Sequence, residues 1–293
     1  MLTISAIIPT CERPVFLRRA LESIVAQELV PVEIIVVDDS GNENTTRTQL
    51  SFRDFGCVRI IANSHRKGPS GARNSGADIA TGDLLAFLDD DDEWLSAYLS
   101  EAHRLFESNL LDVACTDLLC RFEDGIDRAG KSAPEKLQAE NFLTRNPGLV
   151  GSNLTMRRSL YLEIGGFDES LPAGEDTDLG VRLSLREDLK YERLAKKLVR
   201  LHQHNGPQLS TGSSNAICAG MRRFYELHAH RMNEQQQDEF RDNLRRFWGI
   251  DEHGNRLSPS QKAQADSLLR DLKAWLDRKR VALKKTPPTR AGS

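Results

Sequence analysis

Four consecutive aspartates, Asp89 to Asp92, directly follow the apolar run LLAFL. Like charges held together at the end of a buried strand destabilise a fold unless a positive group neutralises them or water reaches them. A bound cation is one such group. Oxygen ligands favour a hard ion such as Mg²⁺ or Mn²⁺, which commonly also binds substrate phosphates. The run therefore predicts a metal site that is shared with a diphosphate.

The direction of each aspartate side chain decides which of them reach a ligand. In an extended chain alternate side chains share a face, so Asp89 and Asp91 form the expected pair, with Asp92 close behind. The alternative is that Asp90, Asp92 and Glu93 are solvated surface charges, one of which caps the next helix. We expect this surface role for Asp90 and Glu93.

Two later segments also carry residues that can do chemistry. Glu175 and Asp176 stand in GEDTD, where a helical pattern begins. Acidic residues in a first helical turn interact favourably with the helix dipole, so this pair has a structural interpretation beside a catalytic one. His202 and His204 stand in RLHQHN. Each is either a surface histidine or a ligand, because imidazole can bind Mn²⁺.

The N-terminal part of the chain has the pattern of a scaffold that could gather such residues. Short β-rich apolar runs alternate there with helical periodicity, which is typical of βαβ units and a mostly parallel sheet. Strands are expected at residues 4–9, 32–37, 58–62 and 84–88, with a helix beginning at Pro14. The runs are continuously apolar, which indicates that helices cover both faces of the sheet.

Polar clusters follow each of these expected strands. They stand at residues 10–13, 38–40, 65–74 and 89–92. Ligands of open α/β sheets bind beyond the carboxyl ends of the strands. We therefore expect the clusters to converge on one crevice.

Beyond about residue 110 the pattern is less regular. Further strands are expected at residues 111–120, 149–156 and 194–201, and helices at 157–164 and 175–187. A polar loop is expected near residues 123–134, and residues 213–285 have an almost entirely helical pattern.

Composition excludes several classes of protein. The net charge of -3 argues against a nucleic-acid binder. The five cysteines form no CxxC pair, so we expect free thiols and no zinc site. The N-terminal apolar run is only about six residues long, so neither a signal peptide nor a membrane span is expected, and we expect a cytoplasmic protein. Neither GxGxxG nor a Walker motif is present, which argues against nicotinamide and P-loop enzymes.

Five motifs in order resemble those of the inverting family 2 glycosyltransferases, which have the GT-A fold. They are SAIIPTCERP, VEIIVVDDSGN, GPSGARNSGADIATGDLLAFLDDDD, GGFDESLPAGEDTDLGVRL and RLHQHN, and they span roughly residues 3–205. The resemblance implies a Rossmann-like α/β domain at residues 1–212, with a nucleotide-binding half (1–110) and an acceptor half (111–212). A helical extension (213–285) and a disordered tail (286–293) are expected to follow.

The resemblance also implies the residues of the site. Nucleotide contacts are expected from Thr10, Glu12, Asp39, Arg73, Asp89 and Asp90. Asp89, Asp91 and His202 would bind Mn²⁺ or Mg²⁺, with His204 as the alternative histidine. Cys11 and Glu12 depart from the family pattern, which makes the base or sugar pocket unusual. Cys11 is either a nucleotide contact or a small residue that fills space.

For catalysis, the resemblance implies that Asp176 is the general base, assisted by Glu175. A positioned carboxylate can take the proton of the acceptor hydroxyl as that oxygen attacks the sugar carbon. The metal would neutralise the charge on the departing diphosphate, so no protein acid is required on that side.

The expected partners are a UDP-, GDP- or dTDP-sugar and a saccharide or lipid-linked acceptor. The amphipathic segment 268–285 could pack on the domain, form a homodimer or touch anionic lipid at the inner face of the membrane. Two alternatives remain: a nucleotidyltransferase on a similar fold, and a non-catalytic protein that binds nucleotide sugars. The acidic pair Glu175 and Asp176 argues against the second.

Overall fold

The computed structural model describes residues 1–41, 58–203 and 214–248. The predictions for His204, for segment 268–285 and for the tail 286–293 therefore lie outside the described residues. Within the described part, no helix combines the length and the apolar composition needed to cross a membrane.

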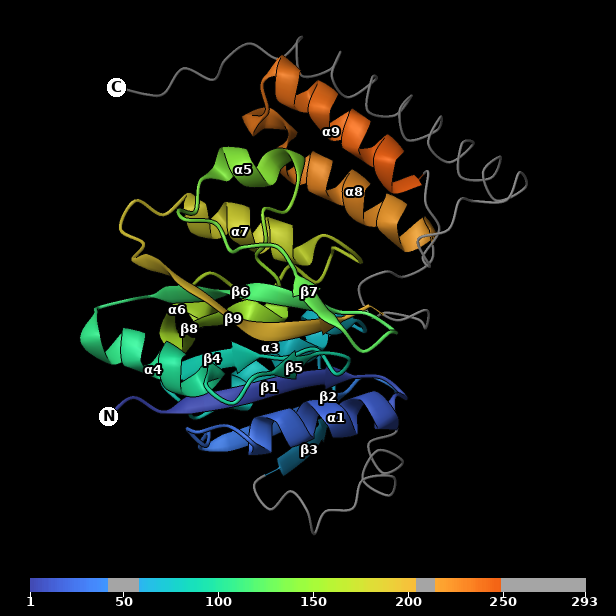
Figure 1. The fold of residues 1–293 in the computed structure, drawn as a ribbon. Helices are drawn as coiled ribbons and strands as arrows, with labels where there is room; N and C mark the ends of the chain where they lie inside the picture. Colours follow the sequence, from blue (N-terminus) through green and yellow to red (C-terminus); the bar gives the residue numbers. More distant parts are fainter. Residues whose placement is uncertain (42–57, 204–213, 249–293) are drawn as a thin grey trace.

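The first half of the sheet is parallel, as its continuous apolar runs predict. It consists of β1 (Ile4–Thr10), β2 (Glu33–Asp38), β3 (Val58–Ala62) and β4 (Leu84–Phe87), in the order β3-β2-β1-β4. Every residue of β1, β2 and β4 is buried. The polar segments that follow these strands consequently leave the sheet at the same edge (Figure 1).

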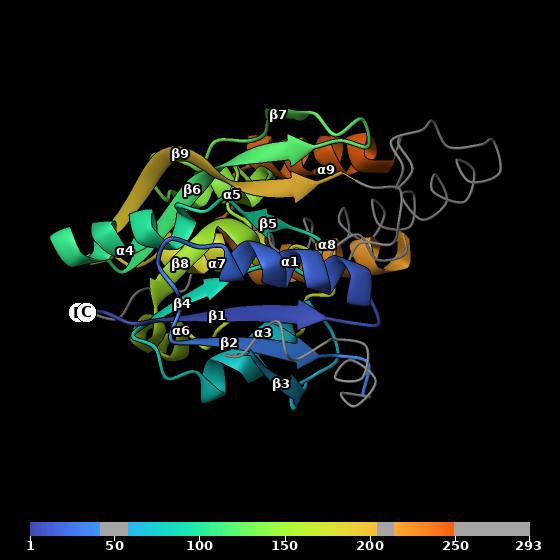
Figure 2. The ribbon, with the colours of Figure 1, turned by 60° about the horizontal axis from the view of Figure 1, so that its bottom comes forward.

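The second half of the sheet is mixed. It continues from β4 through β8 (Leu154–Arg157), β6 (Val113–Arg121), β9 (Tyr191–His202) and β5 (Glu93–Trp94), while β7 (Asp127–Ala129) pairs with β6 (Figure 2). β8 is antiparallel to both β4 and β6, whereas β6 and β9 are parallel to each other. The strands β6 and β9 therefore run in the same direction as the first four, and the mostly parallel α/β fold is confirmed.

Helices cover both faces of the sheet, and alternate strand residues enter two separate cores. Ile34 and Val36 of β2 pack with α1 (Pro14–Val25) and α4 (Tyr98–Ser108). Ile35 and Val37 point the other way, into the core that contains Ala72 and Ala77 of α3 (Pro69–Ile79). These two cores hold the strand ends in place.

A further helical layer lies over the second core. It contains α5 (Ala139–Thr144), α7 (Glu175–Ser184), α8 (Ser214–His228) and α9 (Glu234–Trp248), with α7 nearest the sheet (Figure 1). α6 (Arg158–Glu163) follows β8. Phe224 of α8 and Phe240 of α9 belong to the same core as Leu179 of α7. The C-terminal helices thus share the apolar core of the preceding domain.

Several expected boundaries shift in this half. The strand expected at 149–156 is a 3-10 turn (Gly151–Asn153) followed by β8, and the loop expected at 123–134 includes β7. A second 3-10 turn (Ala229–Arg231) connects α8 to the segment before α9.

Candidate active site

The polar segments that follow the parallel strands meet at one edge of the sheet. The hydroxyl of Thr10, at the end of β1, donates to Asp90 Oδ2 over 2.7 Å. The backbone N–H of Asp39, after β2, donates to the carbonyl of Thr10 over 2.8 Å. Asp39 in turn accepts a hydrogen bond of 2.9 Å from the N–H of Gly68, just before α3. The predicted convergence is confirmed for these clusters.

The aspartate run itself is a turn, not the extended segment that we expected. The N–H of Asp92 donates to the carbonyl of Asp89 over 3.0 Å. The side chains consequently do not alternate between two faces. Asp90 and Asp91 share one guanidinium, that of Arg13, whereas Asp89 pairs with Arg73. The expectation of alternating faces is therefore wrong, because the chain reverses where we assumed a straight strand.

Asp90 is the most enclosed of the four aspartates. Its residue exposure is 0%, so the surface-charge interpretation is wrong for this position. It accepts hydrogen bonds from Thr10 and Arg13. Burial raises the pKa of Asp90 to about 7, although the positive charge of Arg13 acts in the opposite direction. Sequence reasoning missed Arg13, which stands among polar residues in PTCERP and gives no local signal of burial.

Asp92 is also enclosed, on the side facing the second half of the sheet. It accepts a hydrogen bond of 2.6 Å from the hydroxyl of Ser152 and lies 3.4 Å from the backbone nitrogen of His202. Burial raises the pKa of Asp92 well above its ordinary value, and the negative charges of Asp91 and Asp89 add to the effect. Asp92 therefore links the aspartate turn to β9 and to the turn before β8.

Arg73 lies between the two acidic segments of the site. Its side chain is 1% exposed, and Nη2 donates to Asp89 Oδ1 over 2.5 Å. Nη1 donates to Glu175 Oε1 over 3.4 Å. The guanidinium also lies over the ring of Phe167, with Cζ 4.9 Å from the ring centroid. A side chain at Gly151 would place its Cβ only 3.1 Å from Arg73 Nε, so glycine leaves room for this buried cation.

The second acidic segment begins α7. Gly174 precedes the helix with φ of 85°, a left-handed conformation that glycine adopts without strain. Glu175 and Asp176 follow in the first turn, and Asp176 Oδ1 is buried without a hydrogen-bond partner among the described residues. Burial raises the pKa of Asp176 well above its ordinary value, Glu175 raises it further, and Arg73 opposes both. Asp176 thus has the character of a strengthened base.

His202 reaches the aspartate turn from the end of β9. Its Nε2 lies 3.4 Å from Glu93 Oε2, and Arg200 of the same strand also pairs with Glu93. The imidazole of His202, together with Arg200, lowers the pKa of Glu93 to about 2. Glu93 is therefore a paired residue of the site, and our expectation of a solvated surface charge was wrong.

Of the residues expected at the nucleotide, Thr10, Glu12 and Asp39 lie at the ends of β1 and β2, whereas Arg73 belongs to α3 and Asp89 and Asp90 follow β4. Glu12 adopts a positive φ of 54°, which is uncommon for a residue with a side chain. Asp39 accepts a hydrogen bond of 2.6 Å from the amide of Asn63. Cys11 is half-buried, and burial together with the charge of Asp39 raises the pKa of its thiol. The nucleotide contacts of Glu12, Asp39 and Cys11 stay predictions.

The carboxylates of the aspartate turn have the chemistry of ligands for a hard cation. The side chains of Asp89 and Asp91 are 18% and 12% exposed, so solvent reaches both. Among the described residues, however, no three His, Cys, Asp or Glu side chains are grouped as a metal site. The donor set fits Mg²⁺ or Mn²⁺ by chemical type, and Arg13 and Arg73 hold it in place here.

The C-terminal helices fix the position of α7 through a buried polar contact between a histidine and a carboxylate. His228 Nε2 of α8 lies 2.8 Å from Asp178 Oδ1, and Arg182 Nε donates to Asp178 Oδ2 over 2.7 Å. Burial would raise the pKa of Asp178, but His228 and Arg182 hold it below its usual range. In addition, Gly220 of α8 packs so closely on the backbone of Ala173 that a Cβ would overlap it. Sequence reasoning missed these contacts between α7 and α8 because His228 and Asp178 are about 50 residues apart in the sequence.

Comparisons with known proteins agree with this arrangement. The family model described as "Glycosyl transferase family 2" matches residues 5–165. A GalNAc(5)-diNAcBac-PP-undecaprenol beta-1,3-glucosyltransferase of Campylobacter jejuni is 39% identical over 33% of this chain and 32% of its own length. The succinoglycan biosynthesis protein ExoO of Rhizobium meliloti is 46% identical over 54% of this chain and 49% of its own length. The matches thus span about a third to a half of these relatives.

A solved structure of similar fold is the S. aureus TarS fragment in complex with UDP-GlcNAc. Its TM-score is 0.63 at 18% sequence identity, and the match covers 96% of this chain and 84% of that one. At this level of identity the likeness concerns the fold. It covers both halves of the sheet and the helical layer.

Proposed function

Because the chain belongs to glycosyl transferase family 2, we propose that it transfers a sugar from a nucleotide-sugar donor to an acceptor hydroxyl. We further propose that transfer inverts the sugar carbon and depends on Mn²⁺ or Mg²⁺. One observation carries this proposal: two acidic segments from separate parts of the chain meet across the guanidinium of Arg73. Sugar transfer needs a donor site and a base beside the hydroxyl that attacks the sugar carbon, and the two acidic segments would supply them.

On the donor side, the nucleoside would lie over the ends of β1 and β2, near Glu12 and Asp39. The hydrogen bonds of Asp39 to Asn63 and Gly68 hold its carboxylate in a defined position before any ligand arrives. Preorganised polar groups of this kind bind a ligand at a lower entropic cost. Thr10 and Asp90 are both buried, so they would lie beneath the residues that contact the nucleoside and support them.

Asp89 and Asp91 would hold the cation, with His202 beside them. When bound, such an ion supplies a Lewis acid that neutralises charge on the departing diphosphate. The protein's own contribution is the shape of the turn. Arg13 and Arg73 keep these carboxylates oriented, although their mutual repulsion would otherwise separate them.

On the acceptor side, Asp176 would remove the proton from the attacking hydroxyl. Its raised pKa makes the carboxylate a stronger base, and its buried Oδ1 has an open hydrogen-bonding position among the described residues. Glu175 contributes through Arg73, whose guanidinium it shares with Asp89. Arg73 thus links Asp89 of the donor site to Glu175, which directly precedes the proposed base.

The acceptor that we propose is a saccharide carried on a lipid. The Campylobacter relative is named for an acceptor attached to diphosphoundecaprenol. An acceptor of this type would place the reaction at the cytoplasmic surface of a membrane. The transferred sugar, the nucleobase of the donor and the linkage formed are to be determined by experiment.

The experiment that tests the proposal begins with donor binding. UDP-, GDP- and dTDP-sugars are screened for thermal stabilisation of the full chain with Mn²⁺ and with EDTA, starting with UDP-GlcNAc. A ligand that binds only the folded state raises the melting temperature. We expect one donor class to stabilise the protein in Mn²⁺ and much less in EDTA.

The reaction class is then read from the products of the donor that binds. Slow donor hydrolysis, or transfer to a lipid-linked saccharide, should release a nucleoside diphosphate. Release of pyrophosphate would instead identify nucleotidyl transfer. Binding without any turnover, across lipid-linked and free saccharide acceptors, would identify a binding protein.

A further inference from the structure

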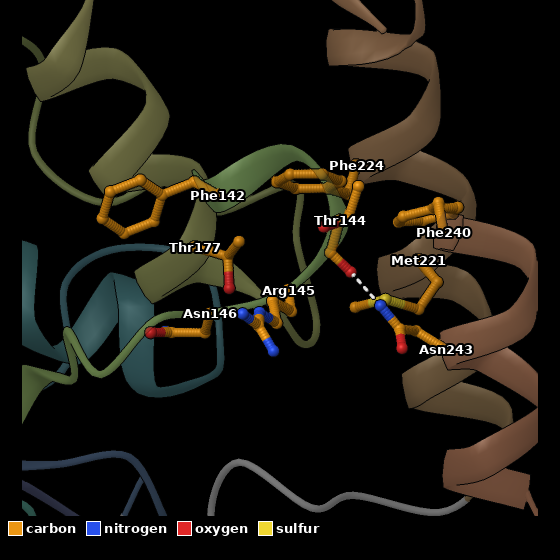
Figure 3. Close-up of a pocket in the computed structure, with 9 residues that line it drawn as sticks. All are labelled: Phe142, Thr144, Arg145, Asn146, Thr177, Met221, Phe224, Phe240 and Asn243. Atoms are coloured by element: carbon orange, nitrogen blue, oxygen red, sulfur yellow. Dashed lines mark hydrogen bonds between the residues drawn. The ribbon is translucent and has the colours of Figure 1, made fainter. Parts of the chain in front are cut away.

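An apolar pocket lies between the helices that surround the first turn of α7. It encloses about 110 Å³ and is lined by Phe142, Thr144, Arg145, Asn146, Thr177, Met221, Phe224, Phe240 and Asn243. These residues come from α5 and the segment after it, from α7, and from α8 and α9. Figure 3 shows the three phenylalanine rings along one side and Arg145 and Asn146 together on the other. The walls are therefore largely apolar, with polar groups at one end.

The pocket lies beside the helical turn that carries the candidate base. Thr177, which lines it, directly follows Asp176 in the first turn of α7. Consecutive Cα atoms are only about 3.8 Å apart, so the pocket and the base share one short stretch of helix. Adjacent residues of a helix point in different directions, so a ligand in this pocket would reach Asp176 only through a group that extends around the first turn of α7.

The polar end of the pocket is positively charged. None of the nine lining residues is acidic. In the described part of the chain, Arg145 forms no ion pair with a carboxylate. Lys131 lies beside it and donates from Nζ to the carbonyl of Asn146 over 3.1 Å. Although Lys131 as a whole residue is exposed, desolvation of its ammonium group, and then the positive charge of Arg145, lower the pKa of Lys131. Two adjacent cations that have no carboxylate partner among the described residues favour an anionic ligand such as a phosphate.

Resting on the proposed function, we infer that this pocket is the subsite for the lipid-phosphate part of the acceptor. The apolar carbons next to the phosphate would enter between the phenylalanine rings, and the phosphate would bind Arg145 and Lys131. A cavity of about 150 Å³ binds benzene in another protein, so 110 Å³ suits one branched five-carbon unit. The attached sugar would then extend toward Asp176, where its hydroxyl loses the proton.

The test uses farnesyl phosphate as the probe, with farnesol and inorganic phosphate as controls. Calorimetric titration of the full chain should give saturable binding of farnesyl phosphate. Farnesol should bind at least tenfold more weakly, and inorganic phosphate weakly or not at all, because the site combines an apolar wall with a cationic end. Equal binding of inorganic phosphate would overturn the inference in favour of a bare anion site.

Two variants locate the binding in this pocket. Arg145→Ala should weaken farnesyl phosphate about tenfold, with a smaller loss for farnesol, since it removes a charge-assisted contact. Met221→Trp should weaken both lipids by filling the pocket. Arg128→Ala is the matched control, because Arg128 is an exposed arginine paired with Asp124 on the β6–β7 hairpin. It should leave both affinities unchanged.

Folding and the proposed function are checked independently. Arg145 is exposed, so Arg145→Ala should keep the wild-type melting temperature even if Met221→Trp does not. The proposed subsite would be overturned if farnesyl phosphate does not bind the wild-type protein. It would also be overturned if Arg145→Ala and a folded Met221→Trp both bind farnesyl phosphate as tightly as the wild type. Donor binding by the wild-type protein is measured in the same series, so the subsite can fail while the proposed transferase activity stands.

Discussion

The two sides of the site are held in place by different means. On the donor side, the carboxylates of the aspartate turn follow β4, a strand whose neighbours β1 and β8 fix it through backbone pairing. On the acceptor side, Asp176 stands on the first turn of α7, and side chains of α8 hold that helix through the His228–Asp178 pair. The donor geometry therefore depends mainly on the sheet, and the acceptor geometry on side-chain contacts between helices.

The region that the family model matches differs between the two sides in the same way. The family model matches residues 5–165 and ends before Glu175. Apart from His202, the donor side lies within the matched region. The proposed base, the His228–Asp178 contact and the apolar pocket lie wholly or partly beyond it. The comparison predicts that variants on the acceptor side change transfer without changing donor binding. The following experiments are arranged from the largest expected effect to the smallest.

Asp176→Asn should separate the two sides most sharply. It keeps the shape of the side chain but removes the base, so we expect transfer to fall by roughly 10²–10⁴-fold. Donor affinity, measured by titration, should stay close to the wild-type value. Asp124→Asn, at an exposed hairpin residue, is the control and should transfer normally. Normal transfer by Asp176→Asn would remove this residue from the proposed chemistry.

Arg73→Met should damage both sides together. Asp89 and Glu175 would lose their shared buried cation, and breaking a buried ion pair typically costs about 3–5 kcal/mol. We expect the midpoint of urea unfolding to fall, and donor binding and transfer to weaken in parallel in whatever protein remains folded. Loss of transfer alone, with intact stability and donor binding, would contradict the bridging role.

His228→Ala should affect only the acceptor side. The buried carboxylate of Asp178 would lose one of its two partners, at a cost of about 1.5–3 kcal/mol. We expect a lower melting temperature and a lower kcat, with unchanged donor affinity. His228→Gln should restore part of the melting temperature and part of the kcat. His230→Ala changes an exposed histidine of the next turn and serves as control. A reduced donor affinity in His228→Ala would break the separation of the two sides.

The smallest effect is expected at His65, which joins a donor-side loop to the acceptor side at the surface. Its Nδ1 lies 2.7 Å from Glu169 Oε1, and its Nε2 lies 2.8 Å from Asp78 Oδ2. The hydrogen bond to Asp78 and the contact with Glu169 raise the pKa of His65 above its ordinary value. The protonated form is thus favoured in the folded state. The stabilisation should be complete below the unfolded pKa, roughly 6.5, and should disappear as the pH rises through the folded pKa.

Urea unfolding between pH 5.5 and pH 9 checks this prediction. His65→Gln should remove the part of the pH dependence that belongs to this group. The change should be well under about 1 kcal/mol, because the partners are partly exposed and screened by solvent. If the contribution of His65 to the free energy of unfolding increases from pH 5.5 to pH 9, the predicted direction of the pH dependence is wrong.

The donor side could be predicted from sequence because its signals are local. Continuous apolar runs gave the first four strands, and the polar residues after them necessarily meet at one edge of a parallel sheet. The turn at Asp89 to Asp92 was not predicted, because periodicity describes straight segments and not chain reversals. Arg13 was missed for a related reason, since only the folded turn gives it two buried partners.

The acceptor side was predictable only in part. GEDTD indicated a helix start with acidic residues, and residues 213–285 indicated helices. Nothing in either pattern could show that Gly220 would pack on Ala173 or that His228 would reach Asp178, because those contacts join distant segments. The burial of Arg73 between two carboxylates likewise depends on both halves being folded.

The tight contact of Gly220 with Ala173 has a consequence for protein engineering. A chimera that exchanges acceptor preference between two relatives would have to transfer the segment from α5 through α9 as one block. A junction placed between α7 and α8 would combine surfaces that did not evolve together, at a spot where even one added methyl group overlaps the main chain. Crossover points upstream of α5 are the ones that keep α5, α7, α8 and α9 together.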